Sequence, residues 1–230
     1  MKTENRFKHE GTVFITLGLL LIAAALSLVL YNFYEEMQAK NSVSQVVSLL
    51  DECLPVESTE EALADSREEP EEADYEEEQV IPDYILAPQK DMPVVTVKGK
   101  DYIGILKIPS LELELPIMNA WNEDNLKVAP CRYMGSAYLN DLIICGHNYK
   151  SHFLRLRKLH EDDTVSFTDV DGNVFIYKVT AMEAIPATAL EEMESGDWDL
   201  TLFTCTLGGR TRVTVRCERQ RFYETRSNAS

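Results

Sequence analysis

A cysteine at the end of one apolar segment and an arginine at the start of the next could carry out chemistry together. Cys205 ends the run LTLFTC, a Gly-Gly turn follows it, and Arg212 opens the next alternating segment. If the two segments pair as a β-hairpin, Arg212 lies beside the thiol and can stabilise an oxyanion. A thiol attacks as the thiolate, which needs a nearby base or cation at neutral pH. The alternative for any single cysteine is a buried small hydrophobic residue.

One of the four histidines stands where it could supply an acid and a base. His147 directly follows an apolar, strand-like run and a glycine, and a strand end is where a rigid scaffold presents a side chain to a cleft. His9 precedes the long apolar segment near the N-terminus, whereas His152 and His160 lie among basic residues. Because imidazole titrates near neutral pH, His147 is the candidate for proton transfer.

The segments that would position these residues read mostly as short strands. From about residue 98, apolar and polar residues alternate, and Asp171-Gly172 is typical of a tight hairpin turn. Strands are expected at 102–109, 111–117, 139–147, 164–170, 174–185, 199–205 and 212–221. Short helical turns are expected near 122–128, 153–159 and 187–193. This many short strands predict a closed β-barrel or a β-sandwich.

Four segments, taken in chain order, resemble sortases, the cell-wall transpeptidases of Gram-positive bacteria. They are YIGILKIPSL at 102–111, Gly-His-Asn at 146–148, TLFTC at 201–205 and the strand RVTVR that Arg212 opens. The similarity spans about residues 100–220. It implies an all-β fold, with an eight-stranded barrel and a few short helices. It also implies that His147, Cys205 and Arg212 converge at one end of a groove.

Other residues near the implied catalytic set carry alternatives. Arg210 lies two residues before Arg212, in the turn, and Arg216 shares its strand face but lies further along. The resemblance directs Thr204 toward the substrate, whereas a β-branched residue in a strand can also serve only to build the sheet.

The implied activity is a two-step acyl transfer that needs no cofactor. In sortases the thiolate attacks the Thr–Gly carbonyl of an LPxTG-like sorting signal on a surface protein and forms an acyl-thioester. An amine of a cell-wall precursor peptide or of a pilin lysine then resolves this intermediate. We therefore expect a cysteine transpeptidase, of a subclass that the sequence leaves open. The alternatives are a catalytically inactive, membrane-tethered binding module and a hydrolytic cysteine protease.

A long apolar segment near the N-terminus predicts a membrane anchor. No charged residue lies between Glu10 and Glu35, and the run from Thr12 to Tyr31 can span roughly 30 Å as a helix. Basic residues precede this run and acidic residues follow it. The N-terminus, 1–10, is therefore expected in the cytoplasm and the catalytic domain outside the cell membrane. A cleaved secretory signal is the alternative, although its apolar region is usually shorter.

Net charge is concentrated in one part of the chain. The formal net charge is −17, and residues 51–80 hold 14 acidic residues against one basic residue. An acidic chain is a poor nucleic-acid binder, because a polyanion repels it. We expect an anchor at 11–34, a largely disordered extracellular acidic linker at 35–97 and a catalytic domain at 98–230. The first part of the linker, 38–50, could extend the anchor helix by a few turns.

The remaining cysteines and the acidic residues before residue 200 have no assigned role. Five cysteines follow the expected anchor, an odd number, so at least one stays free or pairs with another chain. Besides Cys205 they are Cys53, Cys131, Cys145 and Cys217. No metal site is expected: an acidic, solvated loop is the preferred interpretation over a calcium site. The glutamates concerned are Glu183, Glu191, Glu192 and Glu194.

Overall fold

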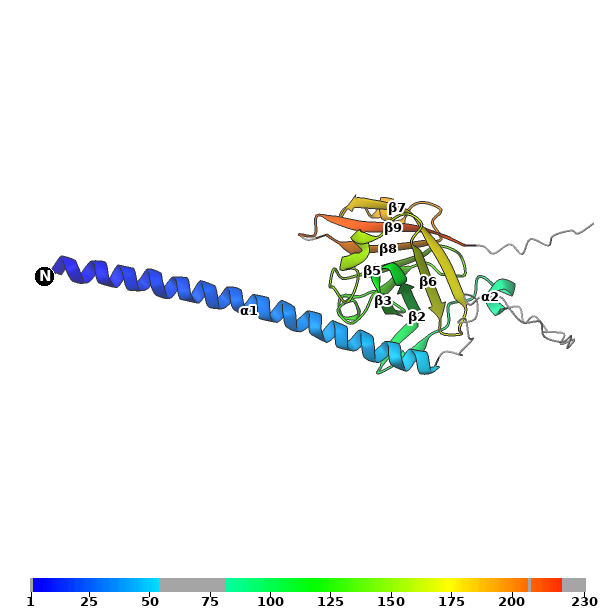
Figure 1. Ribbon diagram of the computed structural model, residues 1–230, viewed down its shortest axis with the longest axis horizontal. Helices are drawn as coiled ribbons and strands as arrows, with labels where there is room; N and C mark the ends of the chain where they lie inside the picture. Colours follow the sequence, from blue (N-terminus) through cyan, green and yellow to red (C-terminus); the bar gives the residue numbers. More distant parts are fainter. Residues whose placement is uncertain (1, 54–81, 207, 221–230) are drawn as a thin grey trace, which may run out of the picture.

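A computed structural model describes residues 2–53, 82–206 and 208–220, with side chains from Phe14 to Leu50 in the first segment. One long helix, α1 (Lys2–Cys53), projects from a β-barrel (Figure 1). Most of the predicted acidic run lies outside the described residues.

Eight strands close into a barrel, which confirms the predicted fold class. Their order is β2-β3-β4-β5-β8-β9-β7-β6, and β6 pairs back onto β2. The strands are β2 (Lys100–Ile108), β3 (Leu113–Met118), β4 (Cys131–Met134), β5 (Leu142–Gly146), β6 (Thr164–Asp169), β7 (Val174–Pro186), β8 (Leu200–Cys205) and β9 (Thr211–Arg219). A further short strand, β1 (Val95–Val97), extends the sheet at β2. The short helices are α2 (Asp83–Leu86), η2 (Pro109–Leu111), α3 (Glu123–Leu126), η3 (Leu154–Lys158) and α4 (Leu190–Glu194).

Two strands, β1 and β4, are absent from the sequence prediction. They span three and four residues, too few to display an alternating pattern. The parallel pairing of β4 with β3 rests on one pair of residues, Met118 and Cys131. The three predicted helical turns, in contrast, each contain a short helix, namely α3, η3 and α4.

Alternation along the strands divides the buried side chains into two layers. Leu202 on β8 and Val215 on β9 belong to the larger hydrophobic cluster, which fills the barrel. Phe203 belongs to a second cluster on the opposite face, with Cys145 and Ile185. Since successive side chains of a strand point to opposite faces, Thr204 follows the inner layer and Cys205 the outer one.

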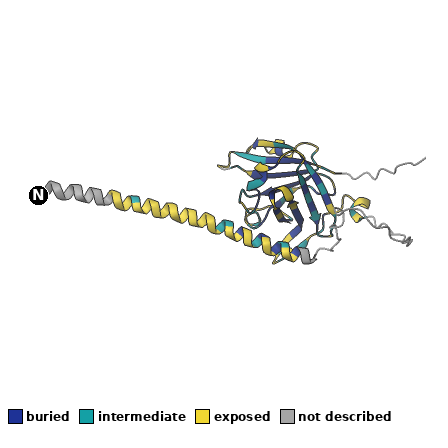
Figure 2. Cartoon of the chain, viewed as in Figure 1, coloured by how far each residue is buried: buried dark blue, intermediate teal, exposed yellow. Residues whose placement is uncertain are grey.

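Helix α1 has two unlike halves. From Phe14 to Tyr34 the helix is mostly apolar and mostly exposed (Figure 2). By length and composition it could cross a membrane. Its C-terminal part contacts β2 and β3 and buries one face. That face consists of Ala39, Val43, Val46 and Leu50, at helical spacing. The segment expected as a linker, 35–97, therefore contains ordered structure at both ends: α1 up to Cys53, and α2 and β1 after residue 82.

Candidate active site

The end of β8 carries Cys205, and strand register fixes its neighbours. Cys205 pairs directly with Arg212 across the antiparallel β8–β9 pair. The two side chains therefore share a face, with Cβ atoms about 5 Å apart. On the other side, β5 runs parallel to β8, and its last paired residue, Gly146, is level with Thr204. His147 directly follows Gly146, so the three predicted residues come from β8, β9 and the segment just after β5, at one end of the barrel.

Cys205 is the exposed thiol among the four described cysteines, all of which are free. Cys131, Cys145 and Cys217 are buried, and burial raises the pKa of each thiol. Cys131 and Cys145 face each other across β4 and β5. The side chain of Cys53 lies outside the described residues. Of the described thiols, Cys205 is the one that a substrate can reach.

The Arg212 guanidinium lies along the face that carries the thiol. It stacks over the Phe203 ring, 5.8 Å from the ring centroid, and Nη1 donates a hydrogen bond to the carbonyl oxygen of Ala187. Phe203 precedes Cys205 by two residues and therefore shares its face. A guanidinium has five N–H donors, and within the described residues Arg212 uses one of them, so four are left for a substrate oxygen.

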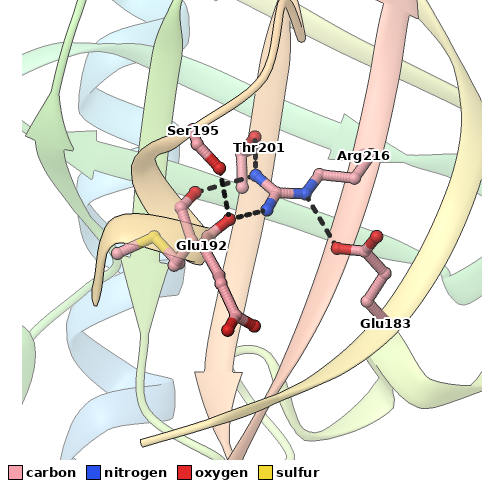
Figure 3. Close-up of polar contacts among 6 residues, drawn as sticks. Glu183, Glu192, Ser195, Thr201 and Arg216 are labelled. Carbon is pink, nitrogen blue, oxygen red and sulfur yellow. Dashed lines mark hydrogen bonds and ion pairs between the residues drawn. The ribbon is translucent and has the colours of Figure 1, made fainter. Parts of the chain in front are cut away.

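The two alternative arginines are differently placed. Arg210 is exposed in the β8–β9 turn. Arg216 shares the face of Arg212, but it pairs with Thr201 and is only 2% exposed. Its N–H groups are bound by the carbonyl oxygens of Glu192 and Met193, at 2.7 and 2.8 Å, by Thr201 Oγ1 at 3.1 Å and by the Glu183 carboxylate at 3.2 Å (Figure 3). Arg216 thus fastens the α4 segment to the barrel and has little capacity left for a substrate.

His147 is half-buried just beyond β5. Its ring stacks on Tyr149, with centroids 4.8 Å apart and an interplanar angle of 30°. Burial lowers the pKa of His147 below its ordinary value; the Glu35 carboxylate raises it and the Lys127 ammonium lowers it further. The imidazole is therefore neutral at pH 7 and can accept a proton.

Tyr149 and Glu35 lie next to the site, although they are far apart in the sequence. Both line a cavity of about 110 Å³ between α1 and the barrel. Burial, and then the negative charge of the Glu35 carboxylate, raises the pKa of Tyr149. No local pattern predicts this contact, because it joins residues far apart in the chain.

A second histidine lies behind this stack. His152 is fully buried, 5.4 Å from Tyr149 between ring centroids. Neither ring nitrogen has a hydrogen-bond partner among the described residues. Burial lowers the pKa of His152 to about 4. It is therefore a neutral, structural residue.

A cavity of about 260 Å³ adjoins the thiol on the face of the β8–β9 pair opposite Arg212. Thr204 lines it, is 3% exposed and has no hydrogen-bond partner for Oγ1 within the described part of the chain. The other principal lining residues are Asn148 after β5, Leu154 and Arg157 of η3, Val213 of β9 and Cys205 itself. The side chain expected to meet substrate is thus buried, with its hydroxyl unsatisfied.

The acidic loop residues do not gather around a common point. Glu183 pairs with Arg216, and Glu194 accepts a hydrogen bond from the Tyr133 hydroxyl. Within residues 82–206 and the other described segments, no three His, Cys, Asp or Glu side chains form a group that could hold a metal ion. That the reaction needs no cofactor remains a prediction from the sequence.

Comparison with known proteins identifies the fold and the family. Sortase A from Corynebacterium diphtheriae shares the fold, with a TM-score of 0.50 at 21% identity over 55% of this chain; the match spans 64% of that sortase. Sortase C from Clostridium perfringens SM101 has 26% identity and a TM-score of 0.46, over 53% of this chain and 71% of that one. No curated protein sequence matches significantly. The family model of the sortase domain matches residues 106–220, half of the chain. The chain belongs to the sortase family.

Proposed function

We propose that this chain is a membrane-anchored cysteine transpeptidase that cleaves an LPxTG-like sorting signal and joins the acyl fragment to an amine. The observation that carries the proposal is the register of three adjacent strands. It pairs the exposed Cys205 with Arg212 on β9, and it ends β5 one residue before the half-buried His147, at the same end of the barrel. Those are the nucleophile, the oxyanion donor and the acid–base group of acyl transfer.

In the first step His147 accepts the proton of the Cys205 thiol, and the resulting thiolate attacks the Thr–Gly carbonyl carbon of the sorting signal. Arg212 donates hydrogen bonds to the oxyanion that forms, and His147 gives a proton to the departing amine. An acyl-thioester on Cys205 remains. In the second step a cell-wall peptide amine or a pilin lysine attacks the thioester, and His147 accepts its proton. No metal or cofactor takes part in these steps.

The long helix favours action at a membrane surface. The β8–β9 turn lies on the side of the barrel nearest the N-terminal half of α1 (Figure 1). Glu35, among the first charged residues after the apolar segment, lines the same small cavity as Tyr149, which stacks on His147. If the apolar half spans the cell membrane with the N-terminus in the cytoplasm, the reactive end faces the outer surface, where membrane-tethered substrates are concentrated.

The test is to trap the acyl-enzyme. The full chain, in nanodiscs, is incubated with an LPxTG-containing peptide and analysed by intact-mass and fragment-ion spectrometry. We expect an adduct of the acyl-fragment mass on Cys205, absent from Cys205→Ala and retained in the matched control Cys217→Ala. An adduct that persists in Cys205→Ala would disprove the assignment. Product analysis with and without added amine then separates transpeptidation from hydrolysis.

A further inference from the structure

The cavity beside Cys205 contains an unused cation. Arg157, on η3, is exposed and is the charged residue among those that line the cavity. Within the described segments its guanidinium makes no hydrogen bond or ion pair, whereas the nearby Arg155 donates to the carbonyl oxygen of Leu111 at 2.8 Å. Arg155 therefore ties η3 to the barrel, and Arg157 is left free to meet a ligand.

A second polar group in the cavity also lacks a partner. Thr204 is 97% buried and lines the cavity, and its Oγ1 has no hydrogen-bond partner among the described residues. A buried hydroxyl without a partner costs free energy that a bound ligand can recover. The cavity thus combines a cation at its rim with a wall residue whose buried hydroxyl is unsatisfied.

The position of the cavity indicates which substrate it would receive. Arg212 lies on the opposite face of the strand pair, so the acyl group, whose carbonyl oxygen must reach Arg212, occupies that face. The cavity remains open on the other side of the thiol, and Asn148, directly after His147, lines it. A molecule that enters there can approach both the thioester carbon and the base.

We propose that this cavity receives the amine substrate of the second step and that Arg157 recognises a carboxylate on it. The inference rests on the proposed transpeptidase function. A volume of about 260 Å³ is slightly below the range typical of small-molecule sites, which suits a short peptide end. A guanidinium binds a carboxylate through two parallel hydrogen bonds, which orients the ligand as well as holding it.

The chemistry balances without any additional reactant. The neutral amine nitrogen attacks the thioester carbonyl carbon, the new C–N bond forms and the C–S bond breaks. The amine proton passes to His147, and the Cys205 thiolate leaves. Arg157 takes no part in the bond changes; it is a positioning residue that holds the amine in line with the thioester.

The test compares two acceptors that differ only in charge. The full chain in nanodiscs is acylated with a sorting-signal peptide, and kcat/KM is measured for glycylglycine and for glycylglycine amide. We expect the wild type to favour the free carboxylate by about tenfold, in line with one partly exposed charged hydrogen bond. Arg157→Gln should bring the ratio near one, Arg157→Lys should restore part of it, and the matched control Lys158→Gln should leave it unchanged. The rate of acylation should be the same in all four proteins.

Two outcomes would overturn the inference: a preference that survives in Arg157→Gln, or an equal loss for both acceptors. A separate measurement distinguishes these from failure of the proposed function. Glycylglycine is titrated into the full-length Cys205→Ala protein while the NMR signals of the Arg157 Nε–H group and the Thr204 methyl group are followed. Saturable shifts that are absent with the amide support the site even if no acyl-enzyme forms, and their absence rejects it.

Discussion

Arg212 and Arg216 lie on the same face of the same strand, yet their surroundings are opposite. Arg212 is half-buried, stands beside the exposed Cys205 and donates one hydrogen bond to the protein. Arg216 is buried, stands beside Thr201 and is bound by two carbonyl oxygens, a hydroxyl and a carboxylate. The two residues are four apart on β9, yet Arg212 has unused hydrogen-bond donors and the donors of Arg216 bind the protein. Residue type alone does not separate a candidate catalytic arginine from a structural one, whereas unused hydrogen-bonding capacity next to an exposed thiol does.

The two histidines near the site repeat this contrast. His147 is half-buried at the barrel end, directly after the last paired residue of β5. His152 is enclosed behind Tyr149. We therefore expect substitutions at the barrel end to change turnover, and substitutions in the buried layer to change stability.

Arg216→Met should produce the largest loss of stability. It leaves the α4 carbonyl oxygens and the partly exposed Glu183 carboxylate without their donor, and each lost hydrogen bond to a charged group costs about 1.5–3 kcal/mol. Urea unfolding of the detergent-solubilised chain measures the free energy of unfolding. The exposed Arg210→Met is the matched control and should change it by less than about 0.5 kcal/mol. Unchanged stability in Arg216→Met would show that the two arginines do not differ as described.

Arg212→Gln should lower kcat/KM for the sorting-signal peptide by about 10²–10³-fold, the usual effect of losing an oxyanion donor. Its free energy of unfolding should stay closer to that of the wild type than that of Arg216→Met, because Arg212 is only half-buried and, among the described residues, donates one hydrogen bond. Arg212→Lys should restore little activity, since an ammonium lacks the forked donor geometry. A variant that keeps full turnover but unfolds more easily would place Arg212 with Arg216 in the scaffold.

His152 should make stability depend on pH. Its pKa is about 4 in the folded chain, below the ordinary value of 6.5 expected for the unfolded one. As pH falls from 6.5 to 4, the unfolded chain takes up a proton that the folded chain does not, so stability decreases by up to roughly 3 kcal/mol. Measured between pH 7 and 4, this decrease should be smaller in His152→Phe and unchanged in the exposed control His160→Gln. An identical pH profile in His152→Phe would contradict the assignment.

Much of the barrel could be predicted from the sequence, because most strands are long enough to alternate and end at clear turns. The pairing of Cys205 with Arg212 also followed from local spacing. The packing of α1 on the barrel did not, since its buried stripe of four small or aliphatic residues is followed by an acidic run typical of a linker. The contact of Glu35 with Tyr149 and the hydrogen bonds of Arg216 to the α4 segment join distant parts of the chain, and no local sequence pattern specifies such contacts.

The most direct test of the account is a crystal structure of the Cys205 adduct with a sorting-signal peptide linked through its threonine position. The account predicts that the peptide carbonyl oxygen lies about 3 Å from a guanidinium nitrogen of Arg212 and that the His147 imidazole faces the linking sulfur. A structure in which the carbonyl oxygen is bound elsewhere, with Arg212 still turned to Ala187 and His147 directed away, would contradict it.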